Sequence, residues 1–143
     1  MAVLTIERSF AAAPAKVFDF VSKTEHLLKW WGPEGMVVPE HQLSFENTGP
    51  WMSVMQNSEG MRVKVSGHVT HVDPPKSVGF TWAWHDENDV RGVESHVIIK
   101  LVPAQGGGTD LTLNHVDLPD DETAKNHEMG WTSSLRKLEQ LAT

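Results

Sequence analysis

The segment DDETAKNHEMGWTSSLRKLEQLA, residues 120–142, predicts the helix around which the rest of the chain is arranged. Its acidic start suits the positive end of a helix dipole. One apolar stripe follows at helical spacing, made of Trp131, Leu135, Leu138 and Ala142, with Ala124 and His127 extending it toward the N-terminus. A helix over about 120–141 is roughly 33 Å long, so it can cross a whole sheet.

Upstream of this helix, apolar and polar residues alternate with a period of two, which predicts β-strands. We expect seven of them, at about 2–10, 36–45, 50–56, 61–72, 77–85, 93–103 and 109–116. Short turns rich in Gly, Pro and Asn separate the last six strands, which favours an antiparallel meander. Pro14 and Thr24 are suited to begin two short helices after the first strand.

This order of elements predicts an α+β fold in which a curved seven-stranded antiparallel sheet wraps around the long C-terminal helix. A helix with one apolar stripe can cover so wide a sheet only if the sheet curls around it. Such a geometry leaves a gap between sheet and helix, which the two short helices would open or close. We expect a single domain over residues 1–143.

The composition excludes several classes of function. The net charge is −7 and the basic residues are scattered singly, so the cationic surface that nucleic acid requires is missing. The chain contains no cysteine, which removes disulfides, thiol catalysis and cysteine-ligated zinc. Glu7 and Arg8 come too early for the apolar region of a signal peptide, and no run reaches about eighteen apolar residues. We therefore expect a cytoplasmic protein with no membrane span, no cofactor and no metal.

The gap between sheet and helix is the candidate ligand-binding site. Nine residues are expected to face it or to build its walls: Trp51, Met55, Phe80, Trp82, Trp84, His115, His127, Trp131 and Leu135. The chain has six tryptophans, and because each buries roughly 150–250 Å², most of them must line either the core or a cavity. Gly130 interrupts the helix at a cost of about 1 kcal/mol relative to alanine. Either its backbone approaches the sheet closely, or it leaves space for a ligand.

The histidines and serines form no recognisable catalytic or metal motif. His68 and His71 are three apart in a predicted strand, which would place them on opposite faces and prevent them from binding one ion together. No Gly-x-Ser-x-Gly sequence occurs. His115 and His127 have two interpretations: they donate hydrogen bonds or move a proton in the cavity, or they lock the start of the helix onto the sheet. We therefore name no catalytic residue.

Six local strings occur in an order that covers nearly the whole chain. They are IERSF (6–10), EHLLKWWGPEG (25–35), VDPPK (72–76), FTWAW (80–84), GGTDLTLNH (107–115) and HEMGWTSSL (127–135). Together they resemble the bacterial family named after the activator of the ninety-kilodalton heat-shock chaperone's ATPase, within the START-like (SRPBCC) superfamily. The resemblance implies a helix-grip fold with a hydrophobic pocket between the sheet and the long helix. The chain departs from the family's D-x-R-x-G-G pattern, where it has Ser44, Glu46, Thr48 and Gly49.

Three functional hypotheses follow. The first is a carrier or sensor that binds a small hydrophobic or aromatic molecule in the cavity. The second is an enzyme, such as a cyclase or hydrolase, that uses His115 and His127. The third is a protein-interaction module with a chaperone as its partner, for which an exposed Trp30 or Trp31 would be suited. A homodimer is also compatible with the sequence.

Overall fold

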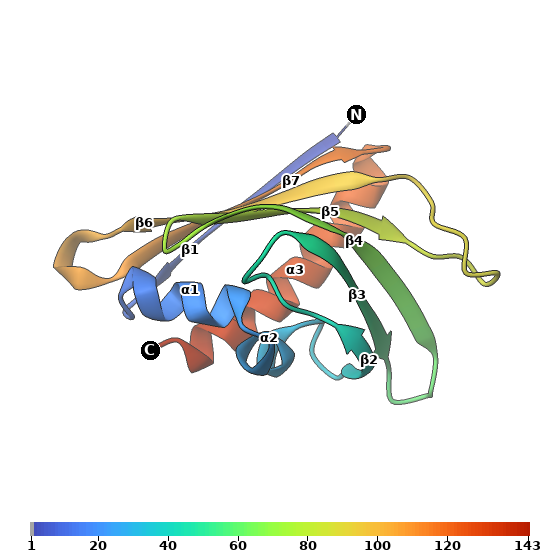
Figure 1. Cartoon of the computed structure of the whole chain (residues 1–143), viewed down its shortest axis with the longest axis horizontal. Coiled ribbons are helices and arrows are strands. Elements are labelled where there is room, and N and C mark those ends of the chain that lie inside the picture. Colours follow the sequence, from blue (N-terminus) through green and yellow to red (C-terminus); the bar gives the residue numbers. More distant parts are fainter. Residues whose placement is uncertain (1) are drawn as a thin grey trace.

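Seven strands form one antiparallel sheet, and three helices lie on one side of it (Figure 1). The computed structural model describes residues 2–143. The strands are β1 (Ala2–Phe10), β2 (Val37–Gln42), β3 (Gly49–Gln56), β4 (Arg62–Asp73), β5 (Ser77–Trp84), β6 (Ser95–Pro103) and β7 (Thr109–Leu118). The helices are α1 (Pro14–Ser22), α2 (Thr24–Trp30) and α3 (Asp121–Leu141), with a short 3-10 turn, η1 (Gln105–Gly107), before β7. The predicted order of elements is confirmed.

The strands lie in the order β1-β7-β6-β5-β4-β3-β2, so consecutive strands from β2 to β7 pair as neighbours. The first strand returns to pair with the last, for example with Ile6 opposite Leu113. Figure 1 shows the sheet bending around the helices at β3 and β2. This confirms the predicted α+β architecture of a curved sheet around the C-terminal helix.

The apolar stripe of α3 packs against the concave face of this sheet. Trp131 is 5% exposed, and Leu135 and Leu138 are fully buried. Asp120 begins the helix because its carboxylate accepts a hydrogen bond from the Thr123 amide at 2.7 Å. Hydrogen bonds from Thr123 also hold the pKa of Asp120 below its usual value.

The strand predicted at 36–45 ends three residues early. Leu43 and Phe45 leave the edge of the sheet and turn inward, where they are 2% and 0% exposed. The Phe45 amide donates to the Ser22 carbonyl at 2.8 Å, at the end of α1. The burial of these two side chains therefore explains why the edge strand stops at Gln42.

The prediction that His68 and His71 lie on opposite faces of the sheet is wrong. A β-bulge interrupts the pairing of β4 with β5 between Val69 and His71, and it adds one residue to the alternation. His68 is exposed beside the buried Val69, and the His71 ring lies against the outward side of Gly79. Both histidines therefore lie on the convex face.

Candidate functional site

A cavity of about 310 Å³ lies between α3, β3, β5 and the turn that follows α2. Its lining residues are Trp31, Gly32, Pro33, Met55, Trp82, Trp84, Asn126, His127, Gly130, Trp131 and Ser134. None of these side chains is an acid, a lysine or an arginine. The walls therefore present aromatic and aliphatic surface with a few polar groups, which is the usual make-up of a small-molecule pocket.

Trp82 lies at the centre of the aromatic wall. Its ring centroid is 5.2 Å from that of Trp131, 5.4 Å from that of Trp84 and 5.9 Å from that of Trp31. The planes are tilted or edge-on, the arrangements that the ring quadrupoles favour. The Trp82 side chain is 6% exposed, and its indole N–H has no hydrogen-bond acceptor among residues 2–143. An unpaired buried donor of this kind costs about 1–3 kcal/mol.

The two adjacent tryptophans at the end of α2 are both buried. Trp30 is fully buried and donates its indole N–H to the Phe20 carbonyl at 2.8 Å. Trp31 is 2% exposed and donates to the Ser53 hydroxyl at 2.9 Å. Neither residue therefore forms the exposed aromatic patch that would suit a chaperone-binding module, and Trp31 instead supplies a wall of the cavity.

His127 is held between β5 and the first turn of α3. The Trp84 indole N–H donates to His127 Nε2 at 2.9 Å, and His127 Nδ1 lies 2.7 Å from the Thr123 carbonyl oxygen. Because an indole can only donate and a carbonyl can only accept, Nδ1 carries the proton and Nε2 is the acceptor. Both nitrogens of this neutral ring are therefore occupied.

His115 has the opposite tautomer. The Trp131 indole N–H donates to His115 Nδ1 at 3.1 Å, so the ring proton is on Nε2. Nε2 lies 2.6 Å from the Ser95 hydroxyl, which in turn donates to the Trp82 carbonyl at 3.2 Å. Burial, assisted by the nearby imidazoles of His127 and His96, lowers the pKa of His115 to about 3.

These bonds join α3 to β5 and β7. The rings of His115 and His127 also contact each other edge-on, with centroids 4.9 Å apart. A proton added to either ring would break the bond that an indole donates to it. Of the two interpretations, the geometry therefore favours the one in which these histidines lock the helix onto the sheet.

The structure places the nine predicted residues in two layers. Five of them line the cavity: Met55, Trp82, Trp84, His127 and Trp131. The other four, Trp51, Phe80, His115 and Leu135, are buried behind this wall. Trp51 and His115 both contact Trp82, with centroids 5.7 Å and 5.6 Å from its ring. The second layer therefore supports the first.

Several lining residues are not among the nine predicted from the sequence. Trp31, Gly32 and Pro33 enter the cavity wall because the chain turns at the end of α2, and Gly32 has a φ of 84° that suits glycine. The WWGP string predicts this turn, but the position of the turn over α3 depends on tertiary packing. Ser134 lies one helical turn after Gly130 and donates to the Gly130 carbonyl at 3.0 Å.

Gly130 lies where α3 borders the cavity. A Cβ atom added there would have only Pro33 Cγ nearby, at 3.9 Å, and no atom of the sheet within 4 Å. The glycine is therefore not required by a close approach to the sheet. Of the two explanations, the geometry favours space on the cavity side of the helix.

Residues 2–143 contain neither a metal-binding cluster nor a membrane-spanning helix. No group of three or more His, Asp or Glu side chains in this range has an arrangement that could hold a metal ion. No helix in the same range is both long enough and apolar enough to span a membrane.

The fold agrees with the comparisons to known proteins. The family model described as "Activator of Hsp90 ATPase homolog 1-like protein" matches residues 11–143. The chain belongs to this family. A comparison with curated proteins gives no match.

Solved structures of relatives share the architecture of this family member. The AHSA1 protein of Silicibacter pomeroyi is 56% identical, with a TM-score of 0.93 over 97% of this chain and 96% of that one. A protein from Chromobacterium violaceum superposes with a TM-score of 0.86 at 22% identity, over 98% of this chain and 96% of the other. One from Rhodobacter sphaeroides has a TM-score of 0.82 at 22% identity, over 97% and 90%. The last two likenesses concern the fold alone.

Proposed function

We propose that this AHSA1-family protein binds a small, uncharged aromatic or hydrophobic molecule in the cavity between α3 and the sheet, as a carrier or sensor. The observation that carries the proposal is a cavity of about 310 Å³ with aromatic walls and no acid, lysine or arginine among its lining residues. Burying a charged ligand there would cost several kcal/mol without an opposite charge to offset it.

The size of the cavity restricts the ligand. A cavity of about 150 Å³ is sufficient for benzene, and this one has about 310 Å³. A molecule with two fused rings, or an aliphatic one of similar volume, therefore fits best. The tilted rings of Trp82 and Trp131 offer faces and edges for contact with a flat ligand.

The unpaired indole N–H of Trp82 favours a ligand that carries a hydrogen-bond acceptor. The N–H is shielded from water, so we expect a small rotation of the ring when a ligand carbonyl binds to it. The neighbouring indoles of Trp84 and Trp131 are already bonded to histidines. Of these three indoles, only that of Trp82 therefore remains as a donor for a ligand.

The same contacts argue against acid–base catalysis in this cavity. A general base needs a free nitrogen within reach of the substrate, and both nitrogens of His115 and of His127 already have partners.

A chaperone partner and a homodimer stay predictions. The burial of Trp30 and Trp31 removes the aromatic surface that we expected a chaperone to bind.

The proposal is tested with naphthalene and with 2-acetonaphthone, which carries a ketone on the same ring system. We expect both probes to raise the melting temperature and to form one-to-one complexes in native mass spectrometry, because a ligand that binds only the folded state stabilises it. The ketone should bind more tightly. Trp82→Phe should abolish this preference while the naphthalene affinity changes little.

A second variant addresses the cavity itself. Gly130→Leu extends a side chain into the space beside Pro33, and it should weaken both probes about tenfold or more while the fold is retained, because leucine is a better helix former than glycine. Met129→Leu is the matched control, since Met129 is the preceding residue and is 67% exposed. Wild-type protein that neither probe stabilises, or equal binding by Gly130→Leu, would contradict the proposal.

A further inference from the structure

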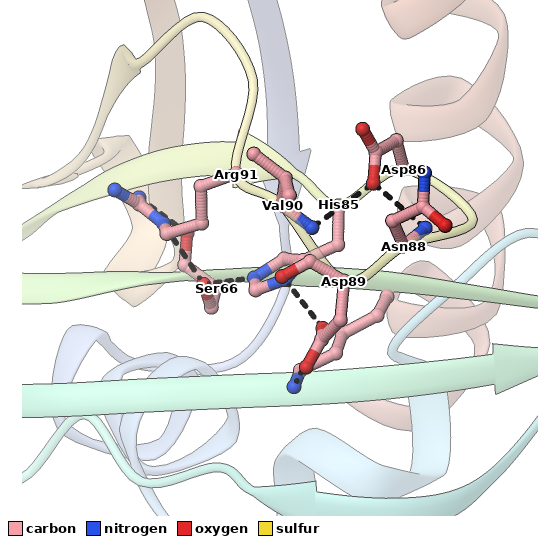
Figure 2. A network of polar contacts seen from close by, with 8 residues as sticks. Ser66, His85, Asp86, Asn88, Asp89, Val90 and Arg91 are labelled. Carbon is pink, nitrogen blue, oxygen red and sulfur yellow. Dashed lines mark hydrogen bonds and ion pairs between the residues drawn. The ribbon is translucent and has the colours of Figure 1, made fainter.

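The convex face of the sheet carries a polar network that is separate from the cavity (Figure 2). Its centre is Ser66 in β4, whose neighbours Val65 and Gly67 are buried toward the helices. Because successive side chains in a strand point to opposite faces, Ser66 points away from the helices. His85 follows β5 directly, and Asp89 and Arg91 belong to the loop after it.

Three of these side chains form a linear chain of hydrogen bonds. Ser66 Oγ lies 2.6 Å from His85 Nε2, and His85 Nδ1 lies 2.8 Å from Asp89 Oδ1. Because a carboxylate can only accept, His85 Nδ1 carries the ring proton and Nε2 is free to accept from the Ser66 hydroxyl. This is the order of nucleophile, base and orienting carboxylate that activates a serine in hydrolases.

Arg91 contacts the serine as well. Its Nε donates to Ser66 Oγ at 3.0 Å, and Nη2 donates to the Ser66 carbonyl at 3.0 Å. Since the guanidinium can only donate, the Ser66 proton is left for His85. A fixed positive charge at this position also favours negative charge that develops on or next to Oγ.

The loop is built so that Asp89 reaches the imidazole. The Asp86 carboxylate accepts from the amides of Asn88 and Val90 at 2.8 and 3.0 Å, which closes a tight turn (Figure 2). Asp89 has a φ of 62°, a left-handed conformation that residues other than glycine adopt at an energetic cost. Lys64 Nζ lies 3.2 Å from the Asp89 carboxylate, and its hydrogen bond, together with that of His85, lowers the pKa of Asp89.

We propose that Ser66, His85 and Asp89 form an acyl-transfer site for small carboxylic esters, with Ser66 as nucleophile, His85 as general base and Asp89 as a positioning residue. Arg91 supplies positive charge beside the tetrahedral intermediate. The network lies on an open strand face, and Asp89 and Arg91 are exposed, so the substrate approaches from solvent. This site does not depend on the ligand-binding function of the cavity.

The reaction needs no reactant other than the ester and water. Ser66 Oγ attacks the ester carbonyl carbon, and the hydroxyl proton moves to His85 Nε2. The tetrahedral intermediate then releases the alcohol, which takes this proton, and leaves an acyl group on Ser66. Water then attacks the carbonyl carbon of the acyl-serine and gives a proton to His85 Nε2, which returns it to Ser66 Oγ as the bond to the acyl group breaks. Ester and water therefore give carboxylic acid and alcohol.

The experiment uses p-nitrophenyl acetate and the intact protein. We expect release of p-nitrophenolate, an adduct with the mass of one acetyl group, and peptide mapping that places this group on Ser66. Ser66→Ala should remove the adduct and lower the rate by about 10²-fold or more, the contribution typical of such catalysis. The mapping of the wild-type protein is decisive even if the variant does not fold.

Two further variants separate chemistry from structure. Thr70→Ala is the matched control, because Thr70 in β4 also pairs with a histidine, with Oγ1 3.2 Å from His96 Nε2, but lacks a carboxylate partner; it should leave the rate unchanged. Asp89→Asn should slow acetylation about tenfold or more at an unchanged melting temperature, and Asp89→Glu should restore part of the rate. Acetyl groups found only on lysines, or equal rates for wild type and Ser66→Ala, would overturn the proposal.

Discussion

The concave and convex faces of the sheet each carry a serine paired with a histidine at the same distance. Ser95 Oγ lies 2.6 Å from His115 Nε2 on the concave side, and Ser66 Oγ lies 2.6 Å from His85 Nε2 on the convex side. The pairs differ in what the other ring nitrogen contacts. Trp131 donates to His115 Nδ1, whereas His85 Nδ1 donates to the Asp89 carboxylate.

This difference reverses the direction of the serine–histidine hydrogen bond. An indole next to Nδ1 puts the ring proton on Nε2, so His115 donates to Ser95 and cannot act as its base. A carboxylate next to Nδ1 puts the proton there, so His85 accepts from Ser66. The distance between two side chains is therefore a poor guide to their chemistry until the partners of both are known.

Acid should destabilise the concave arrangement, because His115 takes up a proton far more readily in the unfolded chain than in the native one. The native pKa of His115 is about 3, whereas an unfolded histidine has a pKa of about 6.5. Between these values the unfolded chain binds a proton at His115 that the native chain does not bind. The contribution of neutral His115 to the free energy of unfolding is therefore complete above about pH 6.5 and is lost as the pH falls toward 3. We expect a loss of about 2 kcal/mol by pH 5.

The measurement is denaturant unfolding of wild type and His115→Gln from neutral pH to pH 5. Other titrating groups are common to both proteins, so their contribution cancels in the difference. The wild type should lose about 2 kcal/mol more than the variant over this range. Parallel pH profiles would show that His115 is not a buried neutral base.

Removal of each serine hydroxyl sharpens the comparison, because the two faces should lose different amounts of stability. Ser95→Ala leaves the buried N–H of His115 without an acceptor, and should cost about 1–3 kcal/mol in the free energy of unfolding. Ser66→Ala is a change at a partly exposed site where water can replace the hydroxyl, so it should stay within about 0.5 kcal/mol of wild type. Equal losses in the two variants would mean that the faces do not differ in the way described.

The periodicity of the sequence was sufficient to predict the fold. The stripe of Trp131, Leu135 and Leu138 identified the buried face of α3, and strand alternation identified Phe80 and Trp82 as inward. These patterns are local, since they depend on spacing within one element. The turn at Leu43 and Phe45 and the bulge before His71 could not be predicted, because they result from contacts with other elements and from a change in strand pairing.

The candidate sites depend on long-range contacts to different degrees. Trp82, Trp84 and Trp131 could be identified because bulky aromatic residues on inward faces must meet across a small core. The network of Ser66, His85 and Asp89 could not, because it requires the register in which Ser66 pairs with Ala83 and a loop that returns Asp89 to His85. No sequence motif marks either requirement.

The two faces differ in the positions of their ring protons, and nitrogen NMR of the histidine side chains tests these positions most directly. The spectrum should be recorded well above the ordinary histidine pKa of about 6.5. We predict that His115 carries its proton on Nε2 and that His85 carries its proton on Nδ1. The same tautomer in both residues, or a proton on Nδ1 of His115, would contradict the account of both faces.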